Sequence, residues 1–358
     1  MLRRQASTRF IHVGPGSQDL QTIADALSGA RKIVAIAGAG ISTAAGIPDF
    51  RSSGGLYVDG ALFKEASFFD ARRAQLLKKA LRIRDLAVSC EPTETHRWLA
   101  SLRSKLLRCY TQNVDMLEAK AGMKVGLDWD VDCIPLHGSL ANLKCHLCFE
   151  AYEWQDYRYY IEEYITKDCN TENSDDEDEL TLPLPCPRCN GRFEARKEAG
   201  MRLLPVGQLR PSMVMLDETH PQGEEIAHFV RLDKSASPDL LLVLGTSLKI
   251  SGPKSLLRQF ARPIRRRGGK VVYVNLSKPP SDCGALVDYW VQWDIDEWVR
   301  DLKGRQHQSG AGMRRGCAYR APRKDRIFSL KTRTLLNFKD IEALREPLGS
   351  RSNPILLD

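Results

Sequence analysis

Four short apolar runs are spaced along the chain, and each ends in a cluster of small or polar residues. Stretches of helix-like composition lie between them. Continuous apolar runs of this length are typical of strands that are buried on both faces of a parallel sheet. We therefore expect an α/β fold in which ligands bind beyond the carboxyl ends of the strands. The predicted strands are Lys32–Ala37, Leu106–Tyr110, Leu240–Leu244 and Lys270–Val274.

Two helices are predicted between the first and second strands. Residues 71–86 are rich in Ala, Leu, Arg and Lys, with the leucines near helical spacing. Either Thr93 or Thr95 can cap the next helix, which carries Trp98. We interpret His96, near its start, as a packed or capping histidine and not as a catalytic one.

The composition is that of a globular protein with more than one module. The chain has 358 residues, of which 42% are hydrophobic and 27% charged. No apolar run approaches the ~18 residues of a membrane span, so no membrane partner is expected. Ten cysteines in a long chain without a secretory signal argue against a disulfide scaffold.

The net charge of +8 is unevenly distributed. Residues 262–270 are basic, and residues 303–326 hold eight Lys or Arg against one acid. A solvated tail, a nuclear-targeting segment and a contact with nucleic acid all fit this pattern. The Arg-rich residues 1–10 fit either a disordered arm or a short mitochondrial transit peptide.

A glycine-rich loop follows the first strand. Gly38 and Gly40 allow a tight turn and a close approach to phosphate, and the following N–H groups and helix dipole favour an anion. Thr43 stands where the usual dinucleotide fingerprint has its third glycine. Residues 49–51 (Asp-Phe-Arg) then place a carboxylate, a ring and a guanidinium together, which is typical of a site for a charged, aromatic cofactor.

Two Cys-x-x-Cys pairs predict a metal site. Cys145 and Cys148 form the first pair, and Cys186 and Cys189 form the second. Four thiolates fit one tetrahedral Zn²⁺ with no open position, so the ion is expected to be structural. The intervening segment is longer than the usual ~15–20 residues, which a loop carrying the acidic run 175–179 explains.

His137 is the candidate general base. Its neutral-range pKa suits removal of a proton from a hydroxyl. Gly138 permits close approach, and Ser139 is expected to orient the ring. Together with Gln112, Asn113 and Asp115, His137 indicates a general base in a ribose-binding cleft.

These motifs together resemble the sirtuin family, the NAD-dependent protein-lysine deacylases, over roughly residues 30–300. Segments 53–57, 107–113 and 209–211 more closely resemble the fungal nuclear branch that acts on histones. The family motifs are Gly-Ala-Gly-Ile-Ser (38–42), Gly-Ile-Pro-Asp-Phe-Arg-Ser (46–52), Thr-Gln-Asn-Val-Asp (111–115), Leu-His-Gly-Ser (136–139), the four cysteines, Gly-Thr-Ser-Leu (245–248) and Val-Asn (274–275).

The resemblance implies a site for NAD and an acyl-lysine peptide between two domains. His137 and Asn113 would be catalytic. The residues implied to bind NAD are Gly38, Ala39, Gly40, Ile41, Ser42, Thr43, Ile47, Asp49, Phe50, Arg51, Gln112, Asn113, Asp115, Gly245, Thr246, Ser247, Asn275, Leu276, Ser277 and Ile295.

The implied activity is NAD-dependent deacetylation of protein lysines, with histones as the expected substrate. The acyl oxygen would attack the ribose carbon that bears nicotinamide, and His137 would deprotonate a ribose hydroxyl. Nicotinamide and O-acetyl-ADP-ribose would be released. No Tyr-x-x-Arg pair follows Tyr57, so a neutral acyl group is expected. Mono-ADP-ribosyl transfer to protein, or a catalytically weak zinc-stabilised chromatin-binding module, are the alternatives.

The implied architecture is a Rossmann-like domain with a smaller module made of a zinc ribbon and helices. A nuclear location and association with chromatin are expected, with the mitochondrion as the alternative. The expected segments are an N-terminal arm and helix (1–30), the Rossmann-like NAD-binding domain (31–60, 98–142 and 203–302), a helical insertion (61–97), the zinc ribbon with its acidic loop (143–202) and a basic tail (303–358).

Three features depart from the family pattern. Met116 replaces a small residue after the Asn-x-Asp motif, so the pocket wall is expected to differ. Asp217 stands where glycine is usual, in a segment that pairs with the substrate backbone in the family, so peptide docking or the turn is expected to change. The long loop between the cysteine pairs is the third.

Overall fold

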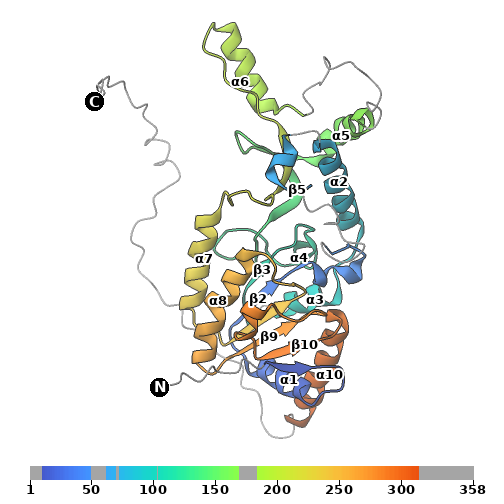
Figure 1. Ribbon diagram of the computed structural model, residues 1–358, viewed down its shortest axis with the longest axis vertical. Coiled ribbons are helices and arrows are strands. Elements are labelled where there is room, and N and C mark those ends of the chain that lie inside the picture. Colours follow the sequence, from blue (N-terminus) through green and yellow to red (C-terminus); the bar gives the residue numbers. More distant parts are fainter. Residues whose placement is uncertain (1–9, 50–61, 70–71, 103, 169–183, 314–358) are drawn as a thin grey trace, which may run out of the picture. The chain divides into compact units, whose positions relative to one another are not determined.

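The computed structural model describes residues 10–49, 62–69, 72–102, 104–168 and 184–313 (Figure 1). All of these residues except Met313 belong to a compact unit that ends at Gly312. The predicted cofactor residues Phe50 and Arg51, the acidic run 175–179 and most of the basic tail lie outside the described residues. None of the described helices is both long enough and apolar enough to cross a membrane.

The described residues form a parallel sheet of seven strands. All four predicted strands are present, and they lie side by side at the centre of the sheet. In spatial order, the strands are β1 (Ile11–Val13), β10 (Tyr289–Val291), β9 (Lys270–Val274), β8 (Leu240–Leu244), β2 (Ile33–Ala37), β3 (Leu106–Thr111) and β4 (Cys133–Pro135).

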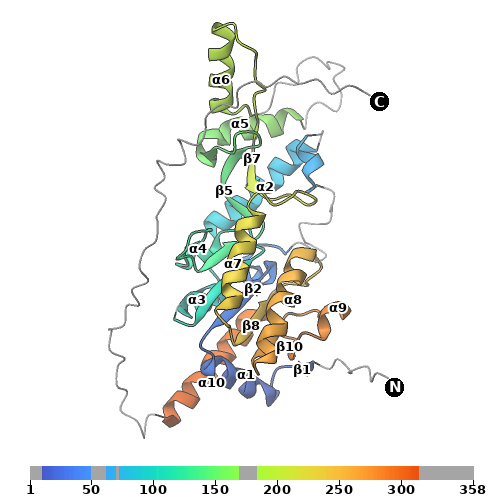
Figure 2. The ribbon, with the colours of Figure 1, turned by 90° about the vertical axis from the view of Figure 1, so that its left-hand side faces the viewer.

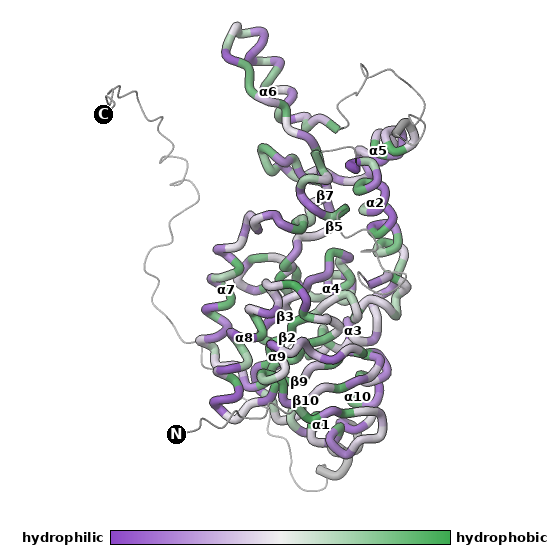
Figure 3. Tube along the Cα trace, viewed as in Figure 1, coloured by the Kyte–Doolittle hydropathy of each residue, from purple (hydrophilic) through white to green (hydrophobic). Residues whose placement is uncertain are grey.

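Helices cover both faces of this sheet, which explains why its central strands are largely apolar. Ala35 and Ala37 of β2 pack into one core, whereas Val34 and Ile36 pack into the other. Figures 1 and 2 show the two helical layers, and Figure 3 shows the hydrophobic strands between them. One layer contains α1 (Asp19–Gly29), α3 (Glu94–Ser101) and α10 (Ile295–Met313); the other contains α7 (Gly223–Ser235), α8 (Ser251–Arg266) and α9 (Ser281–Gly284).

A second, smaller sheet includes the first of the four cysteines, Cys145. It is antiparallel, in the order β6 (Ala151–Glu153), β5 (Gly138–Cys145) and β7 (Leu209–Met213). Its apolar face shares one core with the helical insertion, so ribbon and helices form one module. The helices of the module are α2 (Arg73–Ser89), α5 (Trp154–Asp168) and α6 (Pro187–Glu198).

Three segments fall on different sides of the expected boundaries. Residues 1–30 supply β1, which pairs with β10 at the edge of the large sheet. β7, placed by sequence in the Rossmann-like domain, pairs with β5 in the small sheet. The helix α10 continues to Met313, so the expected tail begins as helix. The strands β1 and β7 are short, and such segments carry little periodic signal.

The second predicted helix begins as expected. Thr93 caps α3 by accepting the His96 N–H, and the His96 ring bonds back to the Thr93 backbone. His96 is fully buried. It is therefore a packed, capping histidine, as the sequence indicated.

The loops after β2 and β8 touch backbone to backbone. Gly40 N–H donates to the Gly245 carbonyl at 2.8 Å, and Gly38 N–H donates to the Leu244 carbonyl at 2.9 Å. A Cβ on Gly40 would lie 2.7 Å from the Gly245 Cα. Glycine is therefore needed at these positions because the two loops contact each other there. The close approach to a ligand that the sequence predicted depends on this contact between the loops.

Replacing Gly40 by Ala tests this contact. Because neither backbone can yield cheaply, we expect G40A to lower the free energy of unfolding by about 1–3 kcal/mol. The matched control is G29A, at the end of α1, where a Cβ meets nothing within 4 Å and Ala is the better helix former. Urea unfolding measures both, and equal stability of G40A and wild type would contradict the account.

Candidate active site

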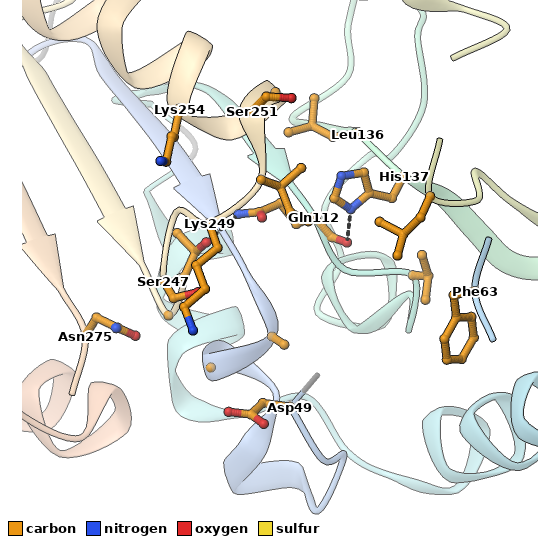
Figure 4. A pocket seen from close by; sticks show the side chains of 18 of the residues that line it. Asp49, Phe63, Gln112, Leu136, His137, Ser247, Lys249, Ser251, Lys254 and Asn275 are labelled. Atoms are coloured by element: carbon orange, nitrogen blue, oxygen red, sulfur yellow. Dashed lines mark hydrogen bonds between the residues drawn. The ribbon is translucent and has the colours of Figure 1, made fainter. Parts of the chain in front are cut away.

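A cavity of about 1100 Å³ lies beyond the carboxyl ends of β2, β3, β8 and β9 (Figure 4). Parallel sheets bind ligands at this edge, where the strand order reverses between β2 and β8. The predicted residues that line the cavity are Ala39, Gly40, Thr43, Asp49, Gln112, His137, Gly245, Thr246, Ser247, Asn275, Leu276, Ser277 and Ile295. The four polar clusters thus meet at one site.

The other described site residues lie behind the cavity wall. Each of them is buried. They are therefore placed to support the wall or to meet a ligand that reaches deeper. These residues are Gly38, Ile41, Ser42, Ile47, Asn113 and Asp115.

No long helix follows the glycine loop in the described residues up to Asp49. Two short 3₁₀ turns, Ala39–Ile41 and Thr43–Ala45, take its place. The expectation of a helix dipole aimed at phosphate is therefore wrong. Any anion at this loop would rely on individual N–H groups and on nearby cations.

The side-chain amide of Gln112 connects the ends of three strands by hydrogen bonds. Its amide Nε2 donates to the Thr246 hydroxyl at 2.9 Å and to the Ala37 carbonyl at 3.2 Å. Thr246 lies just after β8, Ala37 is the last residue of β2, and Gln112 itself follows β3. Because the amide is committed to the scaffold, the position of its own backbone carbonyl is well defined.

That carbonyl orients His137. The His137 Nδ1 lies 3.0 Å from the Gln112 carbonyl oxygen, as the dashed line in Figure 4 shows. A carbonyl can only accept, so Nδ1 carries the proton and Nε2 is left as the free base. Ser139, expected to orient the ring, instead accepts the Ala141 N–H. The orienting group was missed because a backbone carbonyl has no sequence signature.

Burial lowers the pKa of His137 below its usual value, and the hydrogen bond to the Gln112 carbonyl opposes that fall only in part. The imidazole is therefore neutral at physiological pH. At Gly138 the structure shows a close approach to the chain itself: its φ is +70° and a Cβ would lie 2.3 Å from the Ser212 carbonyl oxygen.

Only one of the two polar side-chain atoms of Asn113 has a hydrogen-bond partner among the described residues. Its side-chain Nδ2 donates to the Ser42 hydroxyl at 3.1 Å. Its Oδ1 is buried and has no partner among the described residues. A buried amide oxygen without a donor is costly, so this atom fits a ligand hydroxyl.

Three lysines line the cavity that the sequence analysis did not select: Lys249, Lys254 and Lys278. Lys254 forms an ion pair with Asp282 at 3.2 Å. Figure 4 shows Lys249 beside Ser247. The sequence offers one signal that could have identified these lysines: each follows shortly after one of the predicted polar clusters.

The segment 213–218 forms another wall of the cavity. Leu216 N–H donates to the Phe63 carbonyl at 2.7 Å, and Glu218 is held by the buried Arg210. Asp217 has a φ of +68°, so the chain keeps a left-handed turn despite the change from glycine. Aspartate is among the non-glycine residues that tolerate this conformation, and its exposed side chain is what changes at this wall.

The four cysteines converge. Their sulfur atoms lie within 4.8 Å of one another, with 3.8 Å between Cys145 and Cys189 and 3.6 Å between Cys148 and Cys186. A tetrahedral zinc with bonds of about 2.3 Å places its sulfurs about 3.8 Å apart. The cluster therefore fits one Zn²⁺ with no open position.

Substituting a ligand should remove the metal. For C148S we expect zinc content, measured by plasma mass spectrometry, to fall from about one equivalent towards zero. The melting temperature should fall with it, because the ion crosslinks the ribbon. C90S is the control, since Cys90 bonds a backbone carbonyl away from the cluster. Full zinc occupancy in C148S would exclude Cys148 as a ligand.

A model of the Sir2 family matches residues 38–252 of this chain. The NAD-dependent histone deacetylase HST3 of Candida albicans is 35% identical over 315 residues, which cover 77% of this chain and 60% of that protein. The protein of the same name from Saccharomyces cerevisiae is 33% identical, covering 85% of this chain and 72% of that protein.

Solved structures agree with the sequence relatives. A Sir2 complex with a p53 peptide and NAD⁺ is 26% identical, with a TM-score of 0.57, and covers 82% of this chain and 99% of that one. Sir2Tm bound to a propionylated peptide is 27% identical, with a TM-score of 0.58, and the match covers 82% of this chain and 99% of that one. By sequence motifs, fold and these matches, the chain belongs to the Sir2 family.

Proposed function

We propose that this protein is an NAD-dependent protein-lysine deacetylase that acts on histones. One observation carries the proposal: His137 presents an unprotonated Nε2 to the cavity, and the amide oxygen of Asn113, the residue after Gln112, is buried with no partner among the described residues. The names of the fungal relatives, histone deacetylases that depend on NAD, support the reaction and the substrate. The chain spans 60% of the length of the first of these relatives.

The proposed NAD site uses the residues that the strand ends bring together. Asn113 and Gln112 would hold the nicotinamide ribose, with Ile47 and Asp115 against the nicotinamide. Thr246 and Ser247 would contact phosphate and ribose. The adenosine half would meet residues 275–277, with Ile295 near the adenine. The remaining proposed contacts come from the glycine loop and its continuation: Gly38, Ala39, Gly40, Ile41, Ser42, Thr43, Asp49, Phe50, Arg51 and Gly245.

Bound NAD would supply a ribose carbon that accepts the acyl oxygen as nicotinamide departs. This chain would contribute His137 as general base, because its Nε2 is free and its orientation is set by the Gln112 carbonyl. The apolar lining residues Phe63, Val114 and Leu136 would exclude competing water from the reacting atoms.

The acyl-lysine is proposed to enter between the segment 213–218 and the loop that carries Lys249, since both line the cavity. A nuclear location is part of the proposal. It is supported by the histone deacetylases among the relatives and by the basic composition of residues 303–326.

Mass spectrometry of acetylated histone peptides tests the proposal. With NAD we expect free lysine, nicotinamide and O-acetyl-ADP-ribose in equal amounts, and without NAD no reaction. A peptide that gains ADP-ribose would instead support the transferase, and absence of NAD consumption with every acylated histone peptide would overturn the proposal.

H137A is the matched variant for this assay. Loss of a positioned base should reduce turnover by about 10²- to 10⁴-fold. NAD should still raise the melting temperature, because the proposed binding contacts are intact. Near-normal deacetylation by H137A would remove this residue from the mechanism.

The pH profile reports the same base. Because burial lowers the pKa of His137, the reactive neutral form persists to lower pH than for a free histidine. We expect kcat/KM to rise with pH along an acidic limb whose midpoint lies below about pH 6.5. A midpoint above pH 7 would contradict this environment for His137.

A further inference from the structure

Behind the cavity wall, two carboxyl groups and an imidazole are buried together. Asp115, Glu118 and His96 are 4%, 2% and 0% exposed. Their potential ligand atoms lie within 4.8 Å of one another. Met116, the N-cap of α4 (Leu117–Lys120), has a φ of +64°, and the chain turns sharply there between the two carboxyl groups.

No described lysine or arginine forms an ion pair with either carboxyl group. Burial lowers the pKa of His96 to about 4, so this ring is neutral. Arg97, also on α3, is half exposed and pairs with Glu91 at 4.0 Å. The Nζ of Lys120 is occupied by the backbone carbonyls of Ala87, Val88 and Cys90.

The remaining titratable neighbours come from β3, β4 and α10. The thiols of Cys109 and Cys133 hydrogen-bond to each other, and Glu118 acts on Cys133 through its charge. Asp296 accepts from the Thr95 backbone and hydroxyl and faces His96. The cluster therefore contains two acids and no compensating cation, so both acids cannot be ionised together at neutral pH.

Hydrogen bonds decide which acid keeps the proton. The Asp115 carboxylate accepts from its own backbone N–H, from the Leu117 N–H at 3.1 Å and from the Ser42 hydroxyl. Glu118 contacts the Thr111 hydroxyl at 2.5 Å and its own backbone N–H. Burial raises the pKa of Asp115 as well, but Asp115 has the larger set of donors to stabilise an anion. Burial, and next the charge of Asp115, raise the pKa of Glu118 to about 8.

We propose that Glu118 is a positioning residue that retains the cluster's proton and so keeps Asp115 an anion, ready to accept from the carboxamide of nicotinamide. The inference rests on the proposed function, in which Asp115 lines the nicotinamide pocket. If Asp115 held the proton instead, its carboxyl group would present a donor and lose acceptor strength.

Stability against pH tests the location of the proton without any assay of activity. The unfolded chain releases the Glu118 proton near pH 4.5, whereas the folded chain holds it to about pH 8. Raising the pH across this window therefore favours unfolding of wild type, and E118Q lacks that penalty. We expect the melting temperature of E118Q minus that of wild type to rise by several degrees from pH 5 to pH 8 and then to level off.

The exposed glutamate of α6 provides the matched control. E194Q makes the same chemical change at a half-exposed residue that lies 4.0 Å from the charge of Lys197. The difference in melting temperature between E194Q and wild type should not vary with pH. A pH-independent difference for E118Q as well would overturn the proposal. If E118Q does not fold, D115N serves, since removing the neighbouring charge should move the decline of stability to lower pH; an unmoved decline would overturn the proposal.

Calorimetric titration with NAD from pH 6 to 9.5 tests the link to the pocket. Because Asp115 is an anion throughout if Glu118 holds the proton, the affinity of wild type should be level from pH 6 to about pH 8 and should run parallel to that of E118Q. An affinity that rises with pH in wild type and not in E118Q would show that Asp115 carries the proton, and would overturn the link. Because binding is measured directly, this result stands apart from the peptide assay: absence of deacetylation would count against the proposed function, and these pH profiles against the inference.

Discussion

The site depends on the backbone contact between the loops that follow β2 and β8. These strands are neighbours in space although about 200 residues separate them in the sequence, and Gly40 and Gly245 let their loops meet. The amide of Gln112 extends this joint to β3. Because that amide is fixed, the adjoining carbonyl is fixed too, and it selects the tautomer of His137. The contact between glycines thereby helps to decide which nitrogen of the candidate base carries the proton, while burial keeps the ring neutral.

The parts of the fold that could be predicted are those with strong local signals. β2, β3, β8 and β9 are buried on both faces, so their runs are largely apolar and easily read, although β3 includes the buried Arg108. The cysteine spacing is similarly informative, because four thiolates at that spacing have few other uses. β1 and β7 were not predicted as strands, because each is short and gains its place only by pairing with a distant strand.

At the site, the sequence identified side chains but not their partners. It placed His137 and Asn113 in one cleft; in the structure they follow the neighbouring strands β4 and β3, with His137 lining the cavity and Asn113 buried beside Gln112. It credited Ser139 with orienting the imidazole, whereas a backbone carbonyl does so. It expected a helix after the glycine loop, where two 3₁₀ turns lie. Backbone groups and turn types are set by tertiary contacts, which residue types alone do not encode.

A crystal structure with NAD and an acetyl-lysine peptide bound together tests the central claim most directly. The account predicts the His137 Nε2 at hydrogen-bond distance, about 3 Å, from a hydroxyl of the nicotinamide ribose, with the Asn113 Oδ1 also on that ribose. An imidazole turned away from the sugar, or a ribose lodged elsewhere in the cavity, would contradict the account whatever the fold.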